Sequence, residues 1–255
     1  MSSEFVKKML QLNSSNYVVA YLDVLGATRY MEDDSEQFLN NLNAIYEKAL
    51  DDVMFTNVIT KRNIDIKIFS DNILIAVKTS QDDINRKEKI ERIVQFAGNI
   101  YRNALGYGYL IRGGITEGKF CKNNIFVFGK ALVEAVKLEE NIAIYPRIII
   151  QDKLISSIIP QCVIRDNDGE WYLNTFFING FGCYEKDRTN ILRLLQKNSN
   201  NRKVRQKLNW LVGYFNRFYC SQTCNDEPEY EPISLIDINK TPEEGNNLYN
   251  GVSNG

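Results

Sequence analysis

The order of strand-like and helix-like apolar patterns is the feature that most limits the fold of this chain. Strand-like alternation or short apolar runs mark residues 17–25, 64–77, 109–120 and 145–152. A helical period of apolar residues marks 33–54, 82–108 and 129–142. Because the 64–77 segment contains a tight turn near Ser70, the order reads β-α-β-β-α-β-α-β. This order predicts a ferredoxin-like α+β fold, in which helices pack on one face of an antiparallel sheet.

The pattern changes after residue 152, which predicts a core domain over 1–152 followed by a C-terminal extension over 153–224. A chain of 255 residues is long enough for both. The extension contains a basic helical stretch over 186–220. Residues 225–255 are rich in Asn, Glu, Pro and Gly, which predicts a flexible tail.

Charge and composition exclude several classes of protein. With 31 basic and 32 acidic residues, the net charge of −1 gives no general attraction to nucleic acid or to an anionic membrane. There is no apolar run long enough for a transmembrane helix, and the N-terminus does not resemble a signal peptide. The 5 cysteines have no framework spacing, which indicates reduced thiols and a cytoplasmic location.

The chain contains no histidine. This excludes Ser-His-Asp and Cys-His catalysis and the usual histidine-containing zinc sites. Any chemistry has to come from carboxylates, bound metals, Lys, Arg, Tyr or the backbone.

Two aspartates stand out against this background. Asp23 interrupts the apolar run "YVVAYLDVLG", where an ionised carboxylate is costly unless it is paired or binds a cation. Asp71 lies at the turn of the 64–77 hairpin, which the expected fold places beside the first strand. Two adjacent carboxylates repel unless a cation bridges them, and their oxygens suit Mg²⁺ or Mn²⁺. The alternative is a strand-end Asp and a turn Asp that both face solvent.

The segment "DVLGAT" predicts a sharp exit from the first strand into a helix, with Gly26 at the turn. Backbone amides at such a turn can hold phosphate oxygens. The alternative is an ordinary solvent-facing turn.

Four segments resemble the motifs of class III nucleotidyl cyclases. "YLDVLGAT" resembles D-[IV]-x-G-[FY]-[TS], and "KIFSDNILIAV" resembles K-x-x-G-D-x-x with Ser70 in place of Gly. "RGGITEGKF" and "FGKALVEAVKLEE" resemble the R-x-G-[IL]-x-x-G and G-x-x-V-N-x-A-x-R-L-E motifs. Together with "YPRI", these variants are most similar to the Pycsar pyrimidine cyclases of bacterial antiphage defence. The resemblance covers about residues 15–152.

This resemblance implies a class III cyclase core fold with two Mn²⁺ or Mg²⁺ ions. Asp23 and Asp71 would bind the metals, with the backbone carbonyl of Val24. The implied triphosphate-binding amides are those of Leu25, Gly26, Ala27 and Thr28. The implied reaction is attack of the ribose 3′-oxygen on the α-phosphorus, with pyrophosphate leaving. UTP, giving cyclic UMP, is the favoured substrate, and CTP, giving cyclic CMP, is the alternative.

The chain departs from the purine cyclases at two positions. Val133 and Lys137 stand where the fourth motif has Asn and Arg. As a catalytic residue, Lys137 can supply positive charge but not the two parallel hydrogen bonds that an arginine donates. It could instead be a solvated helix residue paired with Glu134 or Glu140. A degenerate nucleotide-binding module without turnover therefore remains an alternative.

Other cationic residues are candidates for nucleotide contacts. Lys67, four residues before Asp71, could donate to a pyrimidine oxygen or be an exposed strand residue. Arg62 and Arg112 are further candidates. Next to Arg112, the Gly113-Gly114 pair could form a bulge. Arg147 fits a surface or interface position.

The resemblance also implies a homodimer with two interfacial sites, formed by the helices over 82–108 and 129–142, and a separate effector protein that senses the cyclic product.

Other two-metal enzymes are alternatives, including a purine cyclase, a diguanylate-type synthase and a nuclease. The GG[DE]EF signature of diguanylate synthases is absent, however, and the net charge gives no sign of the basic groove that a nuclease needs.

Overall fold

The computed structural model describes residues 14–54, 64–80, 84–123, 126–178, 183–220 and 230–235. The chain divides into two compact units, 1–179 and 180–255. The first unit therefore continues beyond residue 152, because two short strands after that point join its sheet. The flexible tail expected over 225–255 lies mostly outside the described residues, as does the whole segment that contains Arg62.

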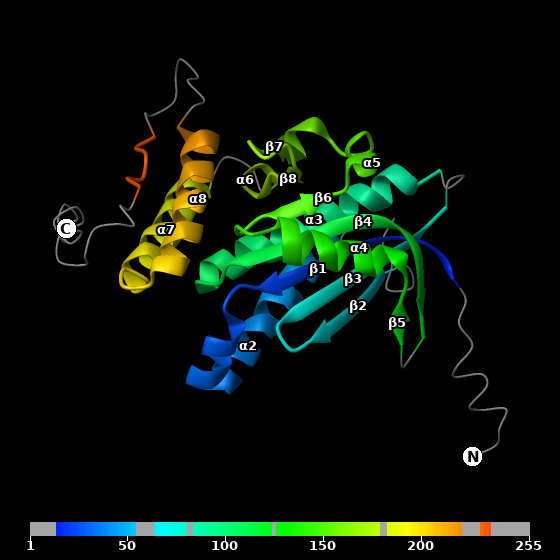
Figure 1. Ribbon diagram of the computed structural model, residues 1–255, viewed down its shortest axis with the longest axis horizontal. Helices are drawn as coiled ribbons and strands as arrows, with labels where there is room; N and C mark the ends of the chain where they lie inside the picture. Colours follow the sequence, from blue (N-terminus) through cyan, green and yellow to red (C-terminus); the bar gives the residue numbers. More distant parts are fainter. Residues whose placement is uncertain are drawn as a thin grey trace. The chain divides into compact units, whose positions relative to one another are not determined.

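The first unit alternates strands and helices in the expected order (Figure 1). Its strands are β1 (Ser15–Val24), β2 (Ile64–Phe69), β3 (Asn72–Thr79), β4 (Ile111–Lys122), β5 (Val127–Phe128), β6 (Ile148–Ile150), β7 (Val163–Arg165) and β8 (Trp171–Leu173). Its helices are α2 (Ala27–Met54), α3 (Arg86–Tyr107), α4 (Lys130–Lys137), the π-helix η1 (Leu138–Ile142), α5 (Asp152–Ile155), the 3₁₀-helix η2 (Pro160–Cys162) and α6 (Thr175–Ile178).

Within the described residues, the strands form one sheet in the order β2-β3-β1-β4-β6-β8-β7, and β5 pairs with β4. The first four strands are antiparallel neighbours in the ferredoxin-like order, which confirms the predicted fold class. The sheet is not wholly antiparallel, because β6 runs parallel to β4. These two strands are joined through α4, and a parallel pair requires such a crossover.

Helices cover both faces of the sheet, so the expectation of helices on one face is wrong. One face of β1 contributes Val18, Ala20 and Leu22 to a core shared with α2 and α3. Its other face contributes Tyr17 and Val19 to a second cluster shared with α4. Because β1 is buried on both sides, a single layer of helices could not shield it from water.

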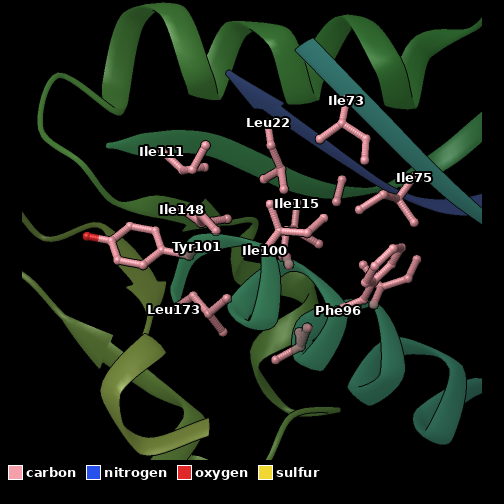
Figure 2. Close-up of a cluster of buried hydrophobic side chains, with 14 of the residues drawn as sticks. Leu22, Ile73, Ile75, Phe96, Ile100, Tyr101, Ile111, Ile115, Ile148 and Leu173 are labelled. Carbon is pink, nitrogen blue, oxygen red and sulfur yellow. The ribbon is translucent and has the colours of Figure 1, made fainter. Parts of the chain in front are cut away.

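The larger core lies between the sheet and α3. Figure 2 shows Phe96 and Ile100 of α3 facing Leu22, Ile73 and Ile75 of the central strands. All five side chains are at most 1% exposed. This packing fixes the ends of β1 and β3, where Asp23 and Asp71 lie.

The helix ends follow local sequence signals, with one departure. The C-cap of α3 is Gly108, the last residue of the helix predicted over 82–108, in a left-handed conformation with φ 82°. Helix α2 begins at Ala27, earlier than predicted, and is interrupted at Asp34 (φ −159°). The carboxylate of Asp34 accepts a hydrogen bond from the backbone N–H of Gln37 (2.9 Å) and so caps the segment that the sequence predicted from about residue 33.

Arg147 lies in the interior of the first unit, so a surface position is wrong. It is 2% exposed and donates to Asp166 (2.6 Å) and to Asp168, in the turn between β7 and β8. It also donates to the carbonyl of Ile142 (3.0 Å). Arg147 therefore ties the β7–β8 hairpin to the end of η1.

Replacing Arg147 with Met should lower the free energy of unfolding by about 3–5 kcal/mol, because it leaves a buried carboxylate without its cation. Urea unfolding of the full chain would measure this loss. As a control, the additional change Asp166→Asn should recover part of it. An Arg147→Met chain as stable as the wild type would contradict the assigned role.

The second unit contains α7 (Tyr184–Lys197) and α8 (Arg202–Tyr219), which confirms helices in the basic stretch. Residues 230–235 are bound to this pair. The Asn216 side chain donates to the carbonyl of Ile233 (2.8 Å) and accepts from its N–H (2.9 Å), and the Tyr184 hydroxyl donates to the Glu231 carbonyl (2.7 Å). Ile233 is 3% exposed, so this part of the segment predicted to be mobile is anchored.

The described cysteines are 121, 162, 183 and 220, and all four are free thiols. None of the helices in the described ranges combines the length and apolar content needed to cross a bilayer.

Candidate active site

Asp23 and Asp71 lie at the same end of the sheet. In the β1–β3 ladder, Asp23 pairs with Asn72, and Asp71 is the turn residue directly before Asn72. On its other side, Asp23 pairs with Arg112 of β4. The hairpin beside the first strand thus brings together the two carboxylates that the sequence singled out.

The turn that carries Asp71 has an unusual backbone. Phe69 and Asn72 close the β2–β3 ladder, and between them Ser70 adopts a φ of 56°. This left-handed conformation favours glycine and is uncommon for other residues. A glycine, which the resembled motif has at this position, adopts such a conformation without steric cost. The Ser70 hydroxyl also contacts the sulfur of Met31 in α2 (3.6 Å), so the turn lies beside the first turns of that helix.

Arg112 joins Asp23 to a second carboxylate, Glu139 of η1. Its Nε donates to Asp23 Oδ2 (3.0 Å), and its Nη1 donates to the Glu139 carbonyl (3.4 Å). Its Nη2 lies 2.6 Å from Glu139 Oε1 as an ion pair, although the angle is not that of a hydrogen bond. The exposed fractions of the side chains are 25% for Arg112, 15% for Asp23 and 4% for Glu139.

The carboxyl groups of this cluster have perturbed acidity. Burial raises the pKa of Asp23 and the Asp71 charge raises it further, while the hydrogen bond and charge of Arg112 oppose the rise. Burial also raises the pKa of Glu139, to about 7, with contributions from Asp23 and Glu140 against the effect of Arg112. Both carboxyl groups are therefore harder to ionise than usual despite Arg112, and a cation bound beside them would favour their charged forms.

Without added divalent cation, Glu139 should make stability depend on pH. The folded protein keeps a proton on Glu139 up to a pKa of about 7, whereas the unfolded chain releases it near 4.5. Raising the pH between these values therefore favours the unfolded state. Over this interval, the melting temperature of the wild type should fall by about 3–6 °C more than that of Glu139→Gln. Thermal melts at several pH values test this, with Glu47→Gln, at an exposed position of α2, as the control; equal pH profiles of the wild type and Glu139→Gln would contradict it.

Gly113 and Gly114 form no bulge, because both stay in register with β1, opposite Leu22 and Tyr21. Gly114 instead lets another segment approach the strand backbone closely. A Cβ on Gly114 would lie 2.4 Å from the Ala135 carbonyl oxygen and 2.7 Å from Leu138 Cβ. The α4–η1 segment therefore rests directly on the β4 backbone, which brings Glu139 to Arg112.

The turn after Asp23 provides the predicted strand-to-helix exit. Gly26 has a φ of 77°, and α2 begins at Ala27. The amide of Leu25 already donates to the Leu110 carbonyl (2.8 Å), so it is not available to a ligand in this structure. The amides of Ala27 and Thr28 are in the first turn of α2, where N–H groups have no partner within the helix.

The other predicted residues occupy different surroundings. Lys67 pairs with Leu74, which pairs with Tyr21, so Lys67 is on the same sheet face as Asp23. Val24 is buried and pairs with Ile111. Lys137 is exposed, and within the described residues no ion pair joins it to Glu134 or Glu140. Arg62 is outside the described residues.

Sequence reasoning missed Glu139 as a site residue. It stands at the Glu of the resembled R-L-E motif, within "KLEEN", but a charged pair on a helix reads as solvated surface. The π-helical turn of η1, in which the Ala143 N–H donates to the Leu138 carbonyl (2.8 Å), accompanies the burial of Glu139. Such turns are frequent at functional sites, but their wider period leaves no clear sequence pattern.

No protein family profile matches the sequence, and no curated protein matches it by sequence. Solved structures do match. The guanylyl cyclase domain of the RhoGC fusion protein from the aquatic fungus Blastocladiella emersonii is similar with a TM-score of 0.50 and 15% identity, covering 64% of this chain and 98% of that domain.

Two further guanylyl cyclase structures are similar. One is the catalytic core of a rhodopsin-guanylyl cyclase with converted specificity in complex with ATPαS (TM-score 0.48, 16% identity, 65% of this chain and 99% of that one). The other is the guanylate cyclase domain of RhGC from Catenaria anguillulae in complex with GTP (TM-score 0.46, 16% identity, 64% of this chain and 98% of that one). With the strand order and the Blastocladiella match, the chain has the fold of a class III nucleotidyl cyclase catalytic core.

Proposed function

We propose that this chain is a pyrimidine nucleotidyl cyclase that converts UTP to cyclic UMP and pyrophosphate. The observation that carries the proposal is the meeting of Asp23 and Asp71 at one end of a cyclase-type sheet, beside the Gly26 turn. No histidine is needed for this chemistry, which suits a chain without one.

The residues present fit a divalent cation site. Among the residues that the structure describes, no three acidic or cysteine side chains are placed to hold a metal ion by themselves. Mg²⁺ and Mn²⁺, however, are commonly bound by one or two carboxylates with water and substrate phosphates. Asp23, Asp71 and the Val24 carbonyl would hold two such ions. When bound, these ions lower the pKa of the ribose 3′-hydroxyl and offset the charge on the phosphates.

The chain's own groups would orient the triphosphate. The amides of Gly26, Ala27 and Thr28 would donate to phosphate oxygens. Arg112 and Lys137 would add positive charge, Lys137 from the partner subunit of a dimer. In the reaction, the bond between O3′ and the α-phosphorus forms, the bond from the α-phosphorus to the bridging oxygen breaks, and pyrophosphate leaves. The 3′-hydroxyl proton passes to solvent.

The preference for UTP rests on Lys67. Lys67 is on the sheet face of Asp23, and its ammonium group would donate to the O4 acceptor of uracil. Cytosine presents a donor at that position, so CTP, giving cyclic CMP, is the second candidate. Arg62 remains a further proposed nucleotide contact.

A homodimer with interfacial sites completes the proposal. Phe128, Val133 and Ile144 are each more than half exposed, on or near α4, and a second copy of the chain would cover such apolar side chains. The enzyme would act in the cytoplasm in bacterial antiphage defence, where a separate effector protein senses the cyclic product. A monomer by light scattering at assay concentration would count against the dimer.

The test is to incubate the chain with ATP, GTP, CTP or UTP separately in the presence of Mn²⁺ and to identify the products by mass. Cyclic UMP as the main product is the expected result. Cyclic CMP as the main product would support the same mechanism but show that the substrate is CTP and not UTP. Nucleotide binding without product would instead favour a degenerate cyclase-like module, which the Val133 and Lys137 departures motivate.

A further inference from the structure

The guanidinium of Arg112 is bound to the carboxylate of Asp23, which the proposed function assigns as a metal ligand. Its Nε donates to Asp23 Oδ2 at 3.0 Å, an ordinary charge-assisted hydrogen bond. Arg112 is directly opposite Asp23 in the β1–β4 ladder, so the two side chains are neighbours by register. A divalent cation bound at Asp23 would meet this positive charge at close range.

Arg112 has a second anchor that does not involve Asp23. Its Nη2 lies 2.6 Å from Glu139 Oε1, and its Nη1 donates to the Glu139 carbonyl at 3.4 Å. Glu139 is held in place because α4 and η1 rest on Gly114. Arg112 can therefore lose its contact with Asp23 and still be held beside the site.

We propose that Arg112 is an internal counter-ion that competes with a divalent cation for Asp23, and that Glu139 is the positioning residue that retains Arg112 when the cation binds. This inference rests on the proposed function for the identity of the cation site. It explains why the protein can keep a partly buried aspartate at that site without metal: Arg112 supplies the opposing charge. It also assigns Glu139 a role in setting how strongly Arg112 holds Asp23, because the guanidinium is shared between the two carboxylates.

The proposal predicts the direction of change in Mn²⁺ affinity. Arg112→Gln should bind Mn²⁺ about tenfold more tightly, because a competing positive charge is removed. Glu139→Gln should bind it about threefold more weakly, because Arg112 is then left with Asp23 as its carboxylate partner. If Glu139 acts through Arg112, Glu139→Gln should have no further effect in a chain that already carries Arg112→Gln.

The experiment is a Mn²⁺ titration of the full chain without nucleotide, in which the electron paramagnetic resonance signal reports free Mn²⁺. Arg86→Gln is the matched control. Arg86 forms a similar pair with Glu117 farther along β4 (2.6 Å), with exposed fractions of 25% and 15%, equal to those of Arg112 and Asp23. This control should leave Mn²⁺ affinity unchanged.

Tighter binding by Arg112→Gln, with a fold confirmed by circular dichroism, supports the counter-ion role. Unchanged or weaker binding by this variant overturns it, as does the absence of Mn²⁺ binding in both the wild type and Arg112→Gln. If Glu139→Gln changes Mn²⁺ affinity equally in the wild type and in a chain that already carries Arg112→Gln, the positioning role of Glu139 is overturned. Product formation by the wild type, measured separately, decides the proposed function: Mn²⁺ competition without cyclic product would retain the counter-ion and reject the cyclase.

Discussion

Asp71→Asn should lower the rate of cyclic nucleotide formation by about a thousandfold or more, since a lost metal ligand is worth several kcal/mol of transition-state stabilisation. Asp23→Asn should have a similar effect. Neither loss should come from unfolding. Asn at position 71 removes the charge that raises the pKa of Asp23, so the melting temperature of Asp71→Asn should stay at or above that of the wild type.

The matched control for this prediction is Asp65→Asn. Asp65 lies on the same hairpin, in β2, and pairs with Lys122 away from the turn. Its replacement should keep more than half of the activity. The measurement is product formation per enzyme by mass spectrometry. A fully active Asp71→Asn chain would remove the basis for a two-metal site.

Gly114→Ala should both destabilise the protein and lower its activity. The added Cβ would lie 2.4 Å from the carbonyl oxygen of Ala135, a backbone atom that cannot move without shifting α4. Overpacking of this kind costs about 1–3 kcal/mol. Because the same shift would move Glu139 away from Arg112, turnover should fall by more than tenfold in addition to the loss of stability.

Gly118→Ala provides a close comparison on the same face of β4. A Cβ at Gly118 would meet its nearest atoms at 3.7 Å or more, which is ordinary contact. Its stability and activity should therefore stay close to those of the wild type. Urea unfolding and turnover would be measured for both variants. If Gly114→Ala behaves like Gly118→Ala, the close packing of α4 on β4 does not hold the site together.

The sequence predicted the parts of this molecule that local periodicity determines. An apolar run predicted β1, and strand-like patterning around a turn predicted the β2–β3 hairpin. Because neighbouring antiparallel strands meet at their ends, this also placed Asp23 near Asp71. The left-handed Gly108 that ends α3 follows from the same kind of local rule. These features depend on residues close in sequence or on a single strand pairing.

Other features depend on contacts that no local pattern encodes. Which face of the sheet α4 covers depends on the crossover from β4 to β6, and the three-residue strands β7 and β8 are too short to show alternation. Arg147 looked like a surface residue because its partners, Asp166 and Asp168, are about twenty positions away. Glu139 was missed because burial of a charged residue on a polar-looking helix depends on tertiary packing.

Ser70 has a consequence for how this site can change over evolutionary time. A left-handed backbone is accessible to Gly, Asn and Asp, but it is costly for β-branched residues. In a library with every amino acid at position 70, selection for cyclase activity should therefore retain chains with Gly, Asn or Asp. Chains with Val, Ile or Thr should be lost. The position beside a proposed metal ligand would then vary within a narrow set of residues that backbone geometry determines.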